Sequence, residues 1–197
     1  MKLKIANIIS TIGHPLLTIP IFVIIVLFNY EDLNTAILIS TLILSCVFVP
    51  LTIKMYKGSR KGTYTNFDIS DKNERQNWYV IVLILLFVLI IILFLTNQPQ
   101  GIKYNALFFF LLLFIAKIGN YFIKTSLHVS LNVFLSFLMM QINLIYGLSF
   151  LGFIFVIAWS RLILKRHTLK EIIYGAVNGL AIGILSFVTM TGHHTRL

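Results

Sequence analysis

Long apolar runs separated by short polar junctions dominate the pattern of this chain. A helix needs about 20 apolar residues to cross the hydrocarbon core of a bilayer, with a range of about 17 to 25. Seven runs come close to this length: Pro15–Tyr30, Thr35–Ile53, Trp78–Thr96, Tyr104–Ile123, Leu127–Ile142, Ile145–Leu164 and Ile172–Met190. The first and fifth are short, so flanking polar residues could extend them or only six runs could cross. The pattern predicts an all-α fold, a polytopic transmembrane helical bundle with about six to seven spans.

Composition supports a membrane protein with one domain. Of the 197 residues, 58% are hydrophobic and only 11% are charged, whereas about a quarter of the residues in a soluble domain are charged. The short connections leave no room for a separate soluble module, so we expect a single integral membrane domain over residues 1–197. The lone cysteine, Cys46, excludes an intrachain disulfide and a cysteine metal cluster.

The positive charge of the chain follows the predicted topology. The net charge is +10, and the basic residues lie between the apolar runs, where lipid headgroups and membrane orientation explain them better than nucleic acid does. If every run spans, the N-terminus, the 57–77 segment and the junctions at 124–126 and 161–171 lie on one side of the membrane. Most of the basic residues lie on that side. The positive-inside rule makes that side cytoplasmic. We expect an integral protein of a bacterial inner membrane, without a nucleic-acid partner and of undetermined oligomeric state.

The segment from Ser160 to Glu171 carries the most informative polar residues. His167 and Glu171 are four residues apart, so on a helix the carboxylate can hold one ring nitrogen and leave the other for nucleophilic attack. Arg161 can offer a planar pair of donors to phosphate oxygens. The alternative is an ordinary positively charged loop with an incidental pair of His and Glu.

Two further polar clusters lie on the same predicted side of the membrane. Ser126, as the N-cap of the fifth run, would form an anion site beside His128; the alternative is a plain serine cap with a histidine packed against a neighbouring helix. Lys72 and Arg75 are three residues apart, so on a helical turn both can address one phosphate. The alternative there is a solvated loop with internal ion pairs.

The spacing around His167 resembles a known family signature. Ser160-Arg161, five residues, His167, three residues and then Glu171 is similar to the third signature of the type 2 phosphatidic acid phosphatase superfamily, in which the acid is usually Asp. Ser126 and His128 resemble the second signature, Pro-Ser-Gly-His, without its Pro and Gly.

The first signature, Lys, six residues, Arg-Pro, is matched only in part. Arg75 is followed by Gln76, and Asp68 stands at the lysine position. Lys72 or Lys61 would then supply the missing cation. The resemblance covers residues 66–179, which would form a phosphatidic acid phosphatase type 2-like core.

The resemblance implies a mechanism without a metal or a cofactor. His167 would attack phosphorus to form a phosphohistidine, and Glu171 would fix its tautomer. His128 would protonate the leaving alkoxide of the lipid and then activate water. The residues expected to bind the phosphate oxygens are Arg161, Arg75, Lys72, Ser126 and Ser160.

Three functions follow from these patterns. The first is a metal-independent phosphatase that hydrolyses a phosphate or diphosphate monoester of a membrane lipid, with phosphatidic acid, phosphatidylglycerophosphate and an isoprenoid diphosphate all open as substrates. The second is a catalytically impaired protein that only binds a lipid phosphate, because two signatures are incomplete. The third, a transporter, would need charges buried within the spans.

Overall fold

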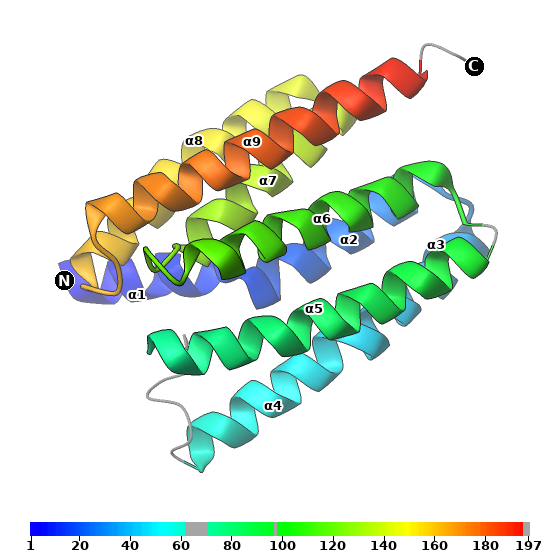
Figure 1. Ribbon diagram of the computed structural model, residues 1–197. Helices are drawn as coiled ribbons and strands as arrows, with labels where there is room; N and C mark the ends of the chain where they lie inside the picture. Colours follow the sequence, from blue (N-terminus) through cyan, green and yellow to red (C-terminus); the bar gives the residue numbers. More distant parts are fainter. Residues whose placement is uncertain (62–70, 97, 195–197) are drawn as a thin grey trace. The chain divides into compact units, whose positions relative to one another are not determined.

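The structure is a computed structural model that describes residues 1–61, 71–96 and 98–194, with only the backbone described for Lys72 and for residues 191–194. Within these residues every regular element is a helix and there is no strand (Figure 1). The elements are α1 (Lys2–Ile12), α2 (Pro15–Tyr30), α3 (Leu33–Ile43), a π-helix η1 (Leu44–Phe48), α4 (Val49–Arg60), α5 (Lys72–Leu95), α6 (Gln100–Gly119), α7 (Leu127–Ile142), α8 (Leu144–Ile163) and α9 (Leu169–His194).

Five helical segments of the described residues are long and apolar enough to cross a membrane. They are Leu33–Arg60, Asn73–Leu95, Gln100–Gly119, Leu144–Ile163 and Leu169–Met190. The bent pair α1 and α2 would be a sixth, whereas α7 is apolar but has only 16 residues. The protein is therefore all-helical and compatible with an integral membrane protein of five to six spans. The fifth predicted run, Leu127–Ile142, coincides with α7, which Ser126 and Asn143 flank at its two ends and which is too short to count among these segments.

The N-terminal residues form a helix that the apolar pattern did not predict. The first predicted run begins at Pro15, but α1 already occupies Lys2–Ile12 and meets α2 at a bend of 44°. Gly13 ends α1, and Pro15 starts α2, where its lack of an N–H costs nothing. The Nδ1 atom of His14 accepts a hydrogen bond of 3.1 Å from the backbone N–H of Leu16. His14 therefore caps α2 and stabilises the bend.

The chain divides into two compact units, and each is described by itself. The first unit contains Met1–Thr18 and Leu107–Leu197, and the second contains Ile19–Ala106. In the first unit, α7 packs against α8 and α9, and α1 packs against α8. In the second unit, η1 continues α3 into α4 and packs against α5. The polar residues singled out above fall in both units.

Small residues bring α9 very close to α7 in the first unit. Gly175, Gly179 and Gly183 are spaced four residues apart on α9, and a Cβ atom at any of them would collide with α7. At Gly175 it would lie 2.7 Å from the carbonyl oxygen of Ser126. Glycine at this spacing is a common basis for close packing between helices in membranes. The start of α9 is thereby held against the start of α7.

Candidate functional site

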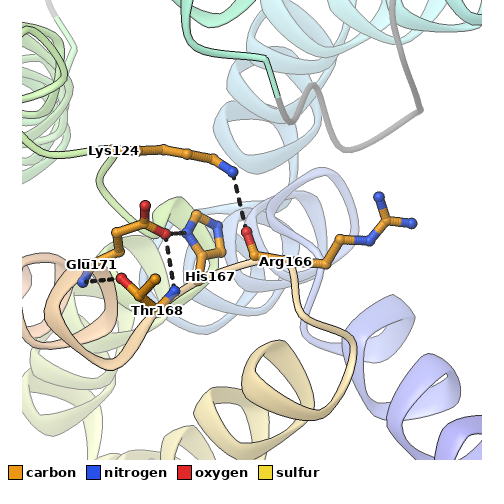
Figure 2. Close-up of polar contacts among 5 residues, drawn as sticks. All are labelled: Lys124, Arg166, His167, Thr168 and Glu171. Carbon is orange, nitrogen blue, oxygen red and sulfur yellow. Dashed lines mark hydrogen bonds and ion pairs between the residues drawn. The ribbon is translucent and has the colours of Figure 1, made fainter.

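The turn between α8 and α9 positions His167 against Glu171 (Figure 2). The Oε2 atom of Glu171 accepts hydrogen bonds from Nδ1 of His167 at 2.9 Å and from the backbone N–H of Thr168 at 3.1 Å. The backbone N–H of Glu171 lies 3.4 Å from Oγ1 of Thr168, so Thr168 and Glu171 form a capping box at the start of α9. The carboxylate thus caps the helix and also fixes the proton of His167 on Nδ1.

Burial strengthens this contact between His167 and Glu171. The side chain of His167 is 1% exposed and that of Glu171 is 19% exposed. A carboxylate that accepts from one ring nitrogen fixes the tautomer and orientation of an imidazole, and it stabilises the imidazolium. Nε2 is the ring nitrogen that Glu171 does not contact, so it is the atom suited to nucleophilic attack.

Two contacts join the junction before α7 to this turn. The ammonium of Lys124 donates to the carbonyl oxygen of Arg166 at 3.1 Å, immediately before His167 (Figure 2). The backbone N–H of Ser126 donates to the carbonyl oxygen of Glu171 at 3.2 Å. The polar cluster around Ser126 and the one around His167 are therefore adjacent in the first unit.

Arg161 lies in the last turn of α8 and is only 1% exposed. Its Nη1 atom donates to Oγ of Ser10 at 2.5 Å and lies 3.5 Å from Nε2 of His128. Because a guanidinium nitrogen can only donate, Nε2 of His128 is the acceptor in this contact. The structure therefore places a buried cation next to the histidine that was expected to act as the general acid.

Ser126 precedes α7 without capping it. Asp32, Asp71 and Asn143 accept backbone N–H groups at the starts of α3, α5 and α8, but the Ser126 side chain forms no such bond. Its Oγ is fully buried and has no hydrogen-bond partner among the described residues. A buried hydroxyl without a partner is costly, and the backbone N–H groups at a helix N-terminus attract anions. Both features suit an anion at the start of α7.

The remaining predicted phosphate-binding residues are Ser160, Arg75 and Lys72. The hydroxyl of Ser160 donates to the carbonyl oxygen of Ile157 at 2.6 Å, so its proton is committed to the backbone of α8. Arg75 is 4% exposed on the first turn of α5 in the second unit. Lys72 begins the same helix, but its side chain lies outside the description, as does the whole of Asp68. A shared role for Lys72 and Arg75 stays a prediction.

Ser10, His14 and Asn132 lie beside the site, although no sequence signature includes them. The ring of His14 packs edge-on against the ring of His128, with centroids 4.8 Å apart and planes at 86°. The amide of Asn132 donates to the carbonyl oxygens of Gly13 and His128, at 2.9 and 2.6 Å. The four-residue spacing of Ala6 and Ser10 was the sequence signal for a helix carrying small residues on one face.

No protein-family model matches the chain, and no curated protein or solved structure matches it. Within the described part of the chain, no group of three or more His, Cys, Asp or Glu residues could hold a metal ion.

Proposed function

We propose that the protein is a member of the type 2 phosphatidic acid phosphatase superfamily and hydrolyses a phosphate or diphosphate monoester of a membrane lipid without a metal. The main support is the 2.9 Å contact between Glu171 and Nδ1 of His167. It leaves Nε2 of a tautomer-fixed histidine as the nucleophile, which is the arrangement that the spacing of the third signature implies.

In the proposed reaction, Nε2 of His167 attacks phosphorus, so an N–P bond forms while the P–O bond to the lipid alkoxide breaks. The three equatorial oxygens carry the developing charge, and catalysis of phosphoryl transfer consists mainly of stabilising them. Arg161, the buried hydroxyl of Ser126 and the N–H groups at the start of α7 supply donors for this purpose.

Lys124 adds a cation within the first unit. Its ammonium lies at the carbonyl oxygen of Arg166, next to the proposed nucleophile. An ammonium has three donors, so Lys124 can bind a phosphate oxygen and keep this contact. Lys124 then contributes the positive charge for which the sequence suggested Lys72 or Lys61.

His128 acts on the leaving group and then on water. When a phosphate oxygen draws the guanidinium of Arg161, Nε2 of His128 loses its contact, takes up a proton from bulk water and donates that proton to the departing alkoxide. The unprotonated ring then takes a proton from the water that hydrolyses the phosphohistidine. The two histidines have distinct roles, and kinetics can separate them.

The direct test uses purified protein in detergent micelles, with phosphatidic acid, phosphatidylglycerophosphate and an isoprenoid diphosphate as alternative substrates and with a chelator present. We expect phosphate release from at least one of them by the unmodified chain and none by His167→Ala. Equal phosphate release by His167→Ala would refute the proposal.

A second candidate function is a lipid-phosphate-binding protein with impaired catalysis. The observation that favours it is the guanidinium of Arg161, which is already engaged by Ser10 and His128. Saturable binding of inorganic phosphate that Arg161→Ala abolishes, without turnover of any lipid phosphate, would establish this function.

The charge distribution supports a cytoplasmic position for the site. Basic residues gather at the ends of helices on the side of the N-terminus, and the positive-inside rule assigns that side to the cytoplasm. Single cysteines placed between residues 57 and 77 in a Cys46→Ser background test this orientation. An impermeant reagent added to intact cells should leave them unlabelled, and labelling from outside would reverse the assignment.

A further inference from the structure

We infer that the bend between α1 and α2, residues Ser10–Leu16, is a positioning element of the site: Ser10 orients the guanidinium of Arg161, and His14 orients the ring of His128. The inference rests on the proposed function and adds residues to which no sequence signature corresponds. Neither residue needs to touch the substrate, because each acts through a residue that does.

The first support is the contact between Ser10 and Arg161. Ala6 and Ser10 are buried on α1, one turn apart, and α1 packs against α8, the helix that carries Arg161. The Oγ atom of Ser10 accepts from Nη1 of Arg161 at 2.5 Å. A guanidinium is a rigid planar fork, so a fixed acceptor at one nitrogen restricts the direction of its other donors. Ser10 therefore fixes the direction in which the other N–H donors of Arg161 point toward a phosphate.

The second support is the contact between His14 and His128. The backbone N–H of Leu16 donates to Nδ1 of His14, so the ring is fixed by the start of α2. The two imidazole rings meet edge to face at a centroid distance of 4.8 Å, an arrangement that aromatic rings favour. On another side, His128 meets Nη1 of Arg161. The His128 ring is thereby held between two partners that both depend on the bend.

The third support is the attachment of the bend to both α7 and α8. Asn132 lies one turn after His128 on α7 and is fully buried, and its amide donates to the carbonyl oxygen of Gly13 at 2.9 Å. A Cβ atom at Gly13 would lie 2.7 Å from Ile157 of α8. The bend is therefore fixed to the helix that carries His128 and fits closely against the helix that carries Arg161. A segment that served only to start a span would not need both contacts.

The test compares Ser10→Ala with Ser10→Thr, which keeps the hydroxyl, and with Ser136→Ala as a matched control. Ser136 is a buried serine of α7 whose hydroxyl donates to the carbonyl oxygen of Val133 in its own helix. Misplacing a group by about 1 Å can cost on the order of a hundredfold in rate. We expect Ser10→Ala to lower kcat/KM for the lipid phosphate by about ten- to a hundredfold, mainly through KM. Inhibition by inorganic phosphate should weaken in parallel, whereas Ser10→Thr and Ser136→Ala should resemble the unmodified chain.

A double-mutant cycle separates positioning from a general loss of structure. Residues that act through one another give non-additive effects. In an Arg161→Lys background, we expect Ser10→Ala to change inhibition by inorganic phosphate less than twofold. An unchanged additional effect in that background would show that Ser10 does not act through Arg161 and would overturn its assignment.

His14→Asn tests the second contact, because asparagine is a good N-cap but lacks the ring. We expect His14→Asn to alter the same limb of the pH profile of kcat that His128→Ala removes. In a His128→Ala background, His14→Asn should have no further effect on the hydrolysis of an aryl phosphate. A His14→Asn profile identical to that of the unmodified chain would overturn the role of His14.

The results distinguish this inference from the proposed function. If the unmodified chain releases phosphate but Ser10→Ala behaves like Ser136→Ala, the inference fails and the proposed function stands. If the chain binds inorganic phosphate without turnover, the role of Ser10 is tested by comparing phosphate binding by Ser10→Ala with binding by the unmodified chain. Equal binding overturns the inference. If it neither releases nor binds phosphate, both proposals fail.

Discussion

Replacing Glu171 with glutamine removes one negative charge while preserving most of the geometry around His167. The Oε2 atom of Glu171 accepts from Nδ1 of His167 and from the backbone N–H of Thr168. An amide oxygen in the same place can accept both hydrogen bonds. What Glu171→Gln loses is the attraction between a carboxylate and the positive ring that develops as His167 attacks phosphorus.

The size of this loss follows from the geometry. With Nδ1 and Oε2 2.9 Å apart, we place the centres of the two charges about 4 Å apart, where an effective dielectric constant of about 20 gives about 4 kcal/mol. The Glu171 side chain is 19% exposed, so solvent screening reduces this value to about 3 kcal/mol. A change of that size slows a step by about a hundredfold.

The assay is rapid-quench measurement of the acid-labile phosphoenzyme in a single turnover, with inorganic phosphate inhibition as the measure of binding. We expect Glu171→Gln to slow formation of the phosphoenzyme by about a hundredfold and to change the inhibition constant by less than about threefold. Glu171→Asp, which keeps the charge on a shorter side chain, should lie between glutamine and the unmodified chain. If Glu171→Gln forms phosphoenzyme at the unmodified rate, the carboxylate does not act on His167 and the mechanism is wrong.

Three further predictions concern the two histidines, Lys124 and the packing of α9. His167→Ala should abolish both turnover and the phosphoenzyme, whereas His128→Ala should lose on the order of a hundred- to ten-thousandfold with a lipid substrate yet regain phosphoenzyme formation with an aryl phosphate, as a quench assay will show. Lys124→Met should raise KM by about tenfold, the effect of losing about 1.4 kcal/mol, and Lys124→Arg should largely restore it; equal KM values would remove Lys124 from the site. Gly179→Ala should destabilise the protein by about 1 to 3 kcal/mol, because its Cβ would meet the backbone of α7, and an unchanged thermal unfolding midpoint would contradict this packing.

The fold could be predicted where it depends on local hydrophobicity. The apolar runs at 15–30 and 127–142 coincide with α2 and α7, because apolar length and helix formation are both properties of the local sequence. The helix at Lys2–Ile12 was missed, since its small residues Ala6 and Ser10 are explained only by their packing against α8. Whether a 16-residue helix crosses a membrane also depends on its neighbours. The number of spans was therefore the feature hardest to predict from the sequence.

The same distinction applies to the candidate site. The spacing of His167 and Glu171 predicted their contact, but the prediction placed both residues on a helix. His167 instead precedes α9, which begins at Leu169, and reaches Glu171 across the capping turn. The contact between Arg161 and Ser10 joins residues 151 positions apart. The periodic pattern of apolar and polar residues cannot indicate such a pair, because the contact exists only after α1 has packed against α8. The hydrogen bond of Ser160 to its own helix was equally hidden from a motif, which records residue types and not the direction of a hydroxyl.

The backbone of Glu171 connects the proposed nucleophile to the proposed anion site. Its side chain holds His167, while its carbonyl oxygen accepts the N–H of Ser126 at the start of α7. This second contact is possible because Gly175, one turn later on α9, lets the Ser126 carbonyl approach more closely than a side chain would allow. A substitution of the Glu171 side chain does not alter the contact of its carbonyl. The start of α7 should therefore keep its place when the charge on residue 171 is removed, which is why we expect phosphate binding and phosphoryl transfer to separate in Glu171→Gln.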